Sequence, residues 1–246
     1  METSSDILSI LILYRGDSIR RLYNLKAVVA SLLPFDGIEI HVREADRVNH
    51  HVVERMLQYV VNYEFVEDTD SILHKTLHFN QMLTCITTPY VGIWDCDVIA
   101  YPESVEECMR ELTTGNAAMA LPYNGVCLDT SRVIADIYMR DYDFMTLKNH
   151  SQLMPKLQPH RLTGGAVLMN RETFRLLGDE NENYYGWGDD DFDRYIRFYN
   201  AQEKIFRSNT PLFHLTHPRG ENSNFNSPLL ALASKTELSK TINCKR

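Results

Sequence analysis

The segment PYVGIWDCDVIA, residues 89–100, decides the fold class that the sequence predicts. Its first half is apolar and rich in β-branched and aromatic side chains, which predicts a short buried strand. Asp95 and Asp97 follow at the carboxyl end of that strand, and alternate residues of a strand point to the same side. If the strand continues through Cys96, both carboxylates face one point, where ligands of open α/β sheets bind. Two carboxylates there suit Mg²⁺ or Mn²⁺, although a turn cap at Asp95 and a solvated Asp97 explain the pair equally well.

Composition and charge narrow the class of protein. The chain has 246 residues, of which 44% are hydrophobic and 24% are charged, as in ordinary globular proteins. No apolar run approaches the roughly 20 residues of a membrane span, and the start METSSDILSILILYRGD lacks the basic region of a signal peptide. The net charge of −8 makes nucleic acid a poor partner, and the five cysteines contain no C-x-x-C pair. We therefore expect one cytoplasmic domain without a transmembrane segment.

Apolar periodicity along the chain predicts alternating strands and helices. The expected strands cover residues 6–13, 37–43, 63–66, 89–94, 117–122, 163–170 and 203–208, and the expected helices cover residues 18–33, 52–61, 73–86, 102–112, 171–177 and 189–200. This alternation predicts an α/β domain with a mostly parallel central sheet flanked by helices. Residues 123–160 are polar and irregular, which predicts a variable insertion or a mobile loop. After Gly220 the chain is rich in Asn and Ser, which predicts an extended or partly disordered tail.

The first expected strand ends in Tyr14-Arg15-Gly16-Asp17, which is not a familiar phosphate-binding fingerprint. Neither G-x-G-x-x-G nor a Walker A loop occurs there, which disfavours simple dinucleotide oxidoreductases and P-loop enzymes. Arg15 nevertheless precedes a helix N-terminus and can contact a diphosphate. Glu44 and Asp46, after the second strand, can accept hydrogen bonds from a uracil or a ribose. Taken singly, each of these residues is more simply explained as a surface side chain.

A second informative stretch is RLTGGAVLMNRETFRLLGDENENYYGWGDDDFDRYIR, residues 161–197. Gly164 and Gly165 would let a bulky ligand approach the backbone closely. Trp187 stands between two glycines just before three consecutive aspartates, and an indole beside carboxylates can stack on a sugar and bind its hydroxyls. The alternative is helix capping by residues 189–191, with Trp187 in the core.

The third stretch is LFHLTHPRG, residues 212–220. His214 and His217 have the i, i+3 spacing that can bind one metal on a helix. Pro218 limits any helix, so we expect a turn here. A structural role is the simpler explanation for either histidine alone, since only the fold can bring the pair to Asp97.

Together these stretches resemble the GT-A fold nucleotide-sugar glycosyltransferases, and the C-terminal half is similar to the galactosyltransferase and chondroitin-polymerase type. The matching segments are the D-x-D motif at 94–97, the glycine-led strand and helix at 164–174, the tryptophan-glycine-acid motif at 186–191, and the histidine pair at 214 and 217. The four motifs in order are far more specific than any one of them. The resemblance implies one GT-A domain over residues 1–246, with a nucleotide-binding half at 6–122 and an acceptor and metal half at 161–222.

The resemblance also implies roles for individual residues. The implied ligands of Mn²⁺ or Mg²⁺ are Asp97, His217 and, less firmly, His214. The implied contacts of the nucleotide sugar are Arg15, Glu44, Asp95 and Gly164. The implied acceptor site contains Gly165, Trp187 and Asp189, with Asp190 as the catalytic base. Residues 123–160 would form a lid over the donor.

The activity implied by the resemblance is transfer of a hexose or N-acetylhexosamine from a UDP-sugar to a glycan or glycolipid hydroxyl. One carboxylate base and no obvious covalent nucleophile favour inversion, although retaining relatives share part of the tryptophan-glycine motif. Tyr185-Gly186 replaces a Trp-Gly of the family, and Asp189 replaces a Glu, which leaves the acceptor open. Without a stem or membrane anchor, the chain looks like a bacterial relative in surface-polysaccharide synthesis, cytoplasmic or peripheral at the inner face of the membrane. A sugar nucleotidyltransferase and a degenerate transferase that only binds carbohydrate are the alternatives.

Overall fold

The computed structural model describes residues 7–220, 222 and 224–244, and its centre is a seven-stranded sheet. The strands are β1 (Leu8–Tyr14), β2 (Ile38–Asp46), β3 (Asn62–Glu67), β4 (Tyr90–Trp94), β6 (Met119–Leu121), β8 (Ala166–Asn170) and β9 (Ile205–Arg207). Their order is β3-β2-β1-β4-β8-β6-β9. The pairs β1–β2, β2–β3, β1–β4 and β6–β9 are parallel, and β8 runs antiparallel to both of its neighbours. The predicted α/β class with a mostly parallel sheet is therefore confirmed.

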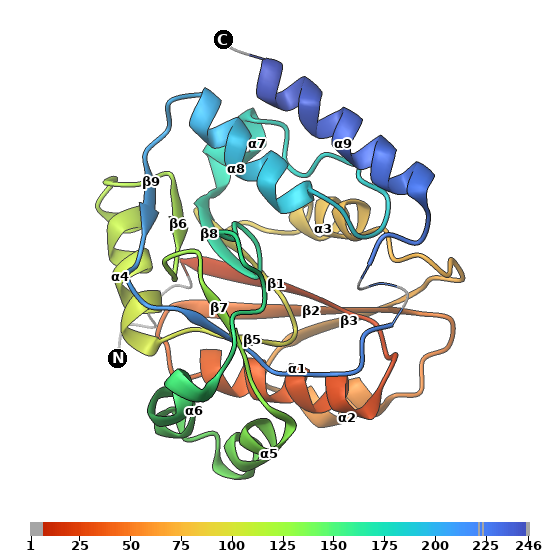
Figure 1. Ribbon diagram of the computed structural model, residues 1–246, viewed down its shortest axis with the longest axis vertical. Coiled ribbons are helices and arrows are strands. Elements are labelled where there is room, and N and C mark those ends of the chain that lie inside the picture. Colours follow the sequence, from red (N-terminus) through yellow and green to blue (C-terminus); the bar gives the residue numbers. More distant parts are fainter. Residues whose placement is uncertain (1–6, 221, 223, 245–246) are drawn as a thin grey trace.

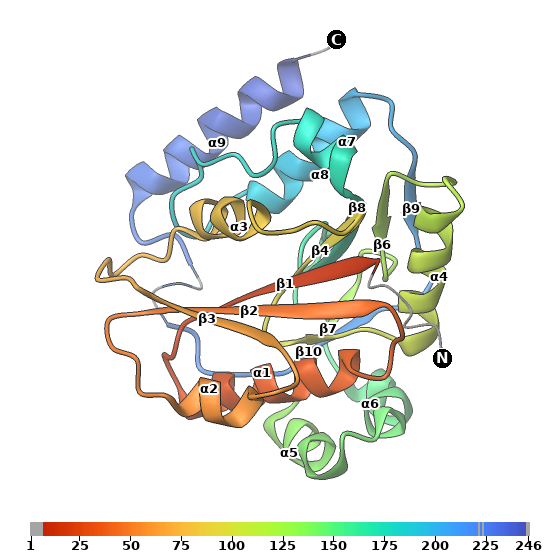
Figure 2. The ribbon, with the colours of Figure 1, turned by 180° about the vertical axis from the view of Figure 1, so that it is seen from behind.

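Helices cover both faces of this sheet, as Figures 1 and 2 show from opposite sides. One layer contains α1 (Ile19–Leu32), α2 (Val52–Leu57), α5 (Arg132–Asp141) and α6 (Phe144–His150). The opposite layer contains α3 (Lys75–Leu83), α7 (Arg171–Leu176), α8 (Asp190–Asn200) and α9 (Pro228–Asn243), and α4 (Pro102–Thr113) stands at the β9 edge. None of the described helices combines the length and the hydropathy that crossing a membrane requires.

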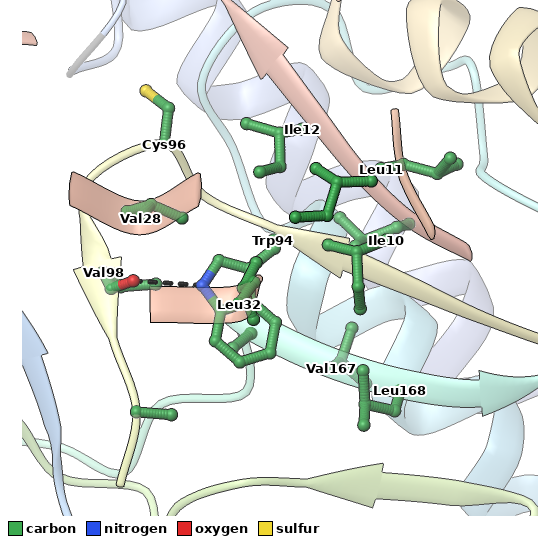
Figure 3. Packing of buried hydrophobic residues seen from close by; sticks show 14 of the residues in the cluster. Ile10, Leu11, Ile12, Val28, Leu32, Trp94, Cys96, Val98, Val167 and Leu168 are labelled. Carbon is green, nitrogen blue, oxygen red and sulfur yellow. Dashed lines mark hydrogen bonds between the residues drawn. The ribbon is translucent and has the colours of Figure 1, made fainter. Parts of the chain in front are cut away.

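The core lies between the sheet and these helices, and the strand before the D-x-D motif is at its centre. All seven residues of β1 are buried beside β4. Trp94 is 1% exposed, and its indole Nε1–H donates to the carbonyl of Val98 at 3.0 Å (Figure 3). The ring packs beside Leu32, so α1 is pressed onto the strand whose end carries the acids. Burying a side chain of this size contributes roughly 2–3 kcal/mol, which anchors that strand end.

A second, three-stranded sheet brings distant segments of the chain to the same place. It contains β5 (Val98–Ile99), β10 (Leu212–His214) and β7 (Cys127–Asp129), in the order β5-β10-β7. In the register of this sheet, His214 lies opposite Val98 on one side and Asp129 on the other. The backbone N–H of Leu215 also donates to the carbonyl of Asp97 at 2.7 Å. The D-x-D motif and the histidine pair are thus joined by backbone pairing.

Several local predictions need correction. The strand does not continue through Cys96, because β4 ends at Trp94 and the motif forms a turn before β5. His214 ends a strand rather than standing in a turn. Strand β8 starts only at Ala166, since Gly165 has φ +87°. Asp6, the predicted start of the first strand, lies outside the described residues.

Two longer segments are more regular than predicted. Residues 123–160 form β7, α5, α6 and a 3₁₀ turn at Ser151–Leu153, because Ser131 and Asp143 cap the two helices with side-chain hydrogen bonds to Ile134 N–H and Met145 N–H. The segment after Gly220, predicted as a tail, contains the 16-residue helix α9, which begins at a Ser227 cap followed by proline.

Candidate functional site

Most of the predicted site residues line one cavity of about 580 Å³ at the junction of the two sheets. Those that line it are Asp95, Asp97, Gly164, Gly165, Trp187, Asp189, His214 and His217. Arg21 and Lys75, which the sequence did not single out, line it as well. The volume lies in the range of cavities that hold small molecules.

The predicted metal ligands meet at one end of the cavity. Asp97, His214 and His217 each offer a ligand atom, and these atoms all lie within 4.8 Å of one another. The Nε2 of His217 is 3.0 Å from Oδ2 of Asp97, which is the separation of neighbouring ligands around an ion with bonds of about 2.1 Å.

Both imidazole rings are oriented by a second hydrogen bond. Nδ1 of His214 lies 2.7 Å from Oδ1 of Asp129, and Nδ1 of His217 lies 2.8 Å from the carbonyl of Pro218. A metal-binding histidine usually donates its other ring N–H to such an acceptor, which turns the remaining nitrogen to the metal. The arrangement therefore fits a divalent ion. Two imidazoles beside one carboxylate suit Mn²⁺ better than Mg²⁺, which prefers oxygen ligands.

Electrostatics at this end keep Asp97 ionised. Burial alone would raise the pKa of its carboxyl, but the hydrogen bond from His217 and the charges of His214 and Arg21 outweigh burial and lower that pKa. For His214 burial would lower the pKa, and its bond to Asp129 with the charge of Asp97 raises it instead. A cation is thus favoured beside Asp97, whether a proton on a histidine or a metal ion.

Arg21, on the first turn of α1, is a cationic group that the sequence reading missed. Its Nη2 lies 3.9 Å from Oδ2 of Asp97 and donates to the Cys96 sulfur at 3.2 Å, while Nη1 pairs with Asp17 at 3.2 Å. Its Nε is buried without a partner among the described residues. The sequence indicated Arg15 as the cationic contact of a diphosphate, whereas the fold turns Arg21 toward the cavity.

The acidic block 189–191 forms another part of the site, and its three aspartates differ. Asp189 and Asp191 line the cavity, whereas Asp190 does not. Asp190 is 3% exposed, its Oδ2 lies 3.1 Å from Nζ of Lys75, and its Oδ1 is buried without a partner among the described residues. The structure therefore puts the predicted base beneath the cavity surface, and its role as base stays a prediction.

Lys75, at the start of α3, connects the two acidic groups. Its ammonium pairs with Asp190, and its charge also acts on Asp191 and Asp95. Burial would lower the pKa of Lys75, but these three carboxylates outweigh it and raise that pKa. Burial in turn raises the pKa of Asp95 and of Asp190, although Lys75 opposes both shifts. No sequence motif identifies Lys75 as a site residue, because only the packing of α3 on the sheet brings it to the aspartates.

The glycines of the motifs have packing reasons. A Cβ at Gly164 would collide with the Asp191 carboxylate, and Gly165 has the left-handed φ that glycine adopts freely. A Cβ at Gly186 would lie 2.7 Å from Ile72, and one at Gly188 would lie 2.9 Å from the hydroxyl of Ser234. The Gly-Trp-Gly frame therefore packs closely on α9 and the loop before α3, in addition to lining the cavity.

Trp187 is not a core residue, contrary to the alternative considered from the sequence. Its side chain lines the cavity and is 39% exposed, with its ring edge-to-face against Phe225 at 4.9 Å. A fixed indole with one open face can stack on the apolar face of a sugar.

Two predicted nucleotide contacts lie away from this cavity. Arg15 is buried, donates to the carbonyls of Ala45 and Asp70 at 2.9 Å each, and pairs with Asp68. Glu44 accepts from the hydroxyl of Tyr63 at 2.6 Å. Neither residue lines the cavity, so their proposed contacts with a nucleotide remain predictions.

The comparisons with known proteins agree with this geometry. Residues 146–219 match the family model described as the N-terminal domain of galactosyltransferase. Among solved structures, a mannosyltransferase from Pyrobaculum calidifontis in complex with GDP-Man and Mn²⁺ superposes with a TM-score of 0.55 at 16% identity. The chain has the GT-A glycosyltransferase fold. The alignment covers 89% of this chain and 59% of the mannosyltransferase, so the chain spans about three fifths of that protein's length. No curated protein matches the chain.

The galactosyltransferase match covers the segment that carries the glycines, Trp187, the aspartates and both histidines, and the D-x-D motif lies before it. The family match and the fold therefore confirm the resemblance to GT-A glycosyltransferases.

Proposed function

We propose that this GT-A protein is a metal-dependent glycosyltransferase that moves a hexose or N-acetylhexosamine from a UDP-sugar to a hydroxyl of a glycan or glycolipid. The observation that carries the proposal is that the cluster of Asp97, His214 and His217 lines the same cavity as Asp189, Asp191 and Trp187. A cation site for a leaving diphosphate and a carboxylate site for an attacking hydroxyl are the two parts that this reaction needs.

The leaving-group side would be formed by the metal cluster and Arg21. Asp97, His214 and His217 would hold Mn²⁺, which supplies positive charge for the departing diphosphate. Arg21 lines the cavity, and its Nε has no partner within the described part of the chain. It would donate hydrogen bonds to the same phosphates. Asp95, whose backbone N–H is fixed to the carbonyl of Gly165 at 2.8 Å, would accept from a donor hydroxyl.

The acceptor side would be formed by the aspartates that reach the cavity. Trp187 stacks on the acceptor ring, Asp189 binds the acceptor hydroxyl, and Asp191 removes the proton of the nucleophile. Asp190, which the sequence predicts as the base, pairs with Lys75 and does not line the cavity, so we assign the proton transfer to its neighbour. Attack from the face opposite the diphosphate inverts the anomeric configuration, as expected when the base and the leaving group lie on opposite sides of the donor.

The biological setting rests on the sequence resemblance. We propose a role in bacterial surface-polysaccharide synthesis, with the protein in the cytoplasm or peripheral at the inner face of the membrane. An acceptor screen with lipid-linked and free glycans would test this part separately from the chemistry.

The decisive experiment is isothermal titration with UDP, UDP-galactose, UDP-N-acetylgalactosamine, UDP-glucose, GDP and GDP-mannose, each with and without Mn²⁺. We expect one nucleotide family to bind only with the metal, and Asp97→Ala to abolish this binding. Asp36→Ala, which removes an exposed carboxylate far from the cavity motifs in sequence, is the matched control. Absence of metal-dependent binding by the wild type would refute the proposal. If GDP and GDP-mannose bind with Mn²⁺ and the UDP compounds do not, the donor nucleotide is GDP and not UDP.

A further inference from the structure

Helix α9 carries a buried polar group at the acceptor side of the cavity. Ser234 is 5% exposed and is the buried residue of α9. Its hydroxyl donates to Oδ2 of Asp189 at 2.9 Å and accepts from the backbone N–H of Asp189 at 3.0 Å. One hydroxyl therefore holds both the main chain and the side chain of a cavity-lining aspartate.

The approach of α9 to this aspartate is close and specific. Gly188 leaves the space that Ser234 occupies, since a Cβ there would lie 2.9 Å from the Ser234 hydroxyl. The neighbouring positions 188 and 189 therefore give one serine the room and the hydrogen-bond partners that it needs.

Four further hydrogen bonds fix α9 to its neighbours. Thr241 donates its hydroxyl to Asp193 of α8, and Nδ2 of Asn200 donates to the carbonyl of Thr241 at 2.9 Å. Near the middle of the helix, the side chains of Asn181 and Asn183 each donate to Glu237 at 3.0 Å. The serine is thus presented by a helix that cannot slide without breaking these bonds.

We propose that Ser234 is a positioning residue for acceptor binding, which makes the C-terminal helix part of the acceptor site. With Oδ2 held by Ser234, the Asp189 carboxylate keeps one rotamer, and Oδ1 accepts from the acceptor hydroxyl. A carboxylate restricted in advance loses less conformational entropy when the acceptor binds. This inference rests on the proposed glycosyltransferase function and deepens its acceptor side.

The test compares wild type, Ser234→Ala, Ser234→Thr and Ser239→Ala. Ser239 lies on the same helix, and its hydroxyl donates to the helix's own Lys235 carbonyl at 2.8 Å, so Ser239→Ala is the matched control. The substrates are the UDP-sugar that binds best with Mn²⁺ and the methyl glycosides of glucose, galactose and N-acetylglucosamine. The readouts are acceptor KM and kcat, the rate of donor hydrolysis by water, and the melting temperature.

We expect Ser234→Ala to raise the acceptor KM about tenfold and to leave donor hydrolysis and metal-dependent donor binding unchanged. Ser234→Thr should restore the KM, and Ser239→Ala should match the wild type. If Ser234→Ala does not fold, Ser234→Cys keeps the volume, weakens the donor and should raise the KM in the same way.

Two results would overturn the role of Ser234 and leave the proposed function intact. One is an acceptor KM of Ser234→Ala equal to that of the wild type. The other is an equal loss of donor hydrolysis and transfer, which a merely structural role of the helix predicts. Absence of metal-dependent donor binding and hydrolysis in the wild type would instead overturn the proposed function, and the inference with it.

Discussion

The two ends of the cavity both carry buried aspartates, but their charges are balanced in different ways. At the metal end, Asp97 faces two histidines, and the nearest permanent cation, Arg21, is 3.9 Å away. At the acceptor end, Lys75 pairs with Asp190 at 3.1 Å and Arg194 pairs with Asp191 at 3.0 Å. The charge of the aspartates at the acceptor end is therefore balanced by the protein itself, whereas the metal end leaves room for a bound cation. Histidines can give up a proton to make room for a metal ion, whereas the lysine and arginine are permanent parts of the fold.

Removing the permanent cation at the acceptor end should have the largest effect. In Lys75→Met, Asp190 stays buried without its partner, and the free energy of unfolding at pH 7 should fall by about 3 kcal/mol. Urea denaturation measures it. The double variant Lys75→Met/Asp190→Asn removes the unpaired charge and should recover most of the loss. Equal instability of the single and double variants would show that Lys75 matters through packing and not through charge.

The metal end should respond in metal affinity and not in stability. His217→Ala removes a ligand atom, and we expect Mn²⁺ to bind roughly 100-fold more weakly. This loss lies at the upper end of that expected when a residue hydrogen-bonded to a metal ligand is removed. Titration with Mn²⁺ in the presence of UDP provides the measurement. His160→Ala, at an exposed cavity position outside the cluster, is the control. An unchanged affinity in His217→Ala would separate the histidine from the metal.

A smaller effect on metal affinity is expected from Asp129, which would act on the metal only through its hydrogen bond to His214. Asp129→Asn weakens the acceptor that orients His214 at 2.7 Å, and Mn²⁺ affinity should fall about tenfold. Asp36→Asn serves as the control for loss of one negative charge. If both substitutions weaken Mn²⁺ binding alike, overall charge and not ring orientation sets the affinity.

The smallest effect concerns pH at the acceptor end. Burial raises the pKa of Asp190 in the folded protein, in spite of Lys75. The folded state therefore binds this proton more tightly than the unfolded chain, and stability falls as the pH rises from about 4 through the folded pKa. Asparagine does not titrate. As the pH rises through this window, the free energy of unfolding of Asp190→Asn should therefore increase relative to that of the wild type by on the order of 1 kcal/mol. Urea denaturation at intervals from pH 4.5 to 8 tests the sign, and a difference independent of pH would contradict it.

The sequence predicted the sheet well where periodicity and burial agree. The apolar runs of β1, β4 and β8 were correctly predicted as buried strands. The motifs beside β4 and β8 line the cavity as expected, whereas Arg15 after β1 does not. Helix α9 was missed because its sequence mixes leucines with serines and threonines on every side, so no apolar face marks it. Its Ser227 cap and following proline were signals that could have revealed it.

Long-range electrostatics explain most of what was missed in the site. Arg21 and Lys75 resemble surface cations in a linear sequence, and only the packing of α1 and α3 turns them to the aspartates. The choice among Asp189, Asp190 and Asp191 depends on helix phase at the first turn of α8, where the boundary of the helix decides which carboxylate faces inward. A sequence pattern predicts such a boundary less well than it predicts the helix itself.

The contact between Gly188 and Ser234 also has a consequence for how this protein can change over generations. Any side chain at 188 would need the serine to retreat, and a retreating serine would release the neighbouring Asp189. A substitution of Gly188 is therefore expected to be harmful unless position 234 changes with it. Although far apart along the chain, the two positions should be inherited as a single unit, and a new acceptor preference would arise by replacing both together.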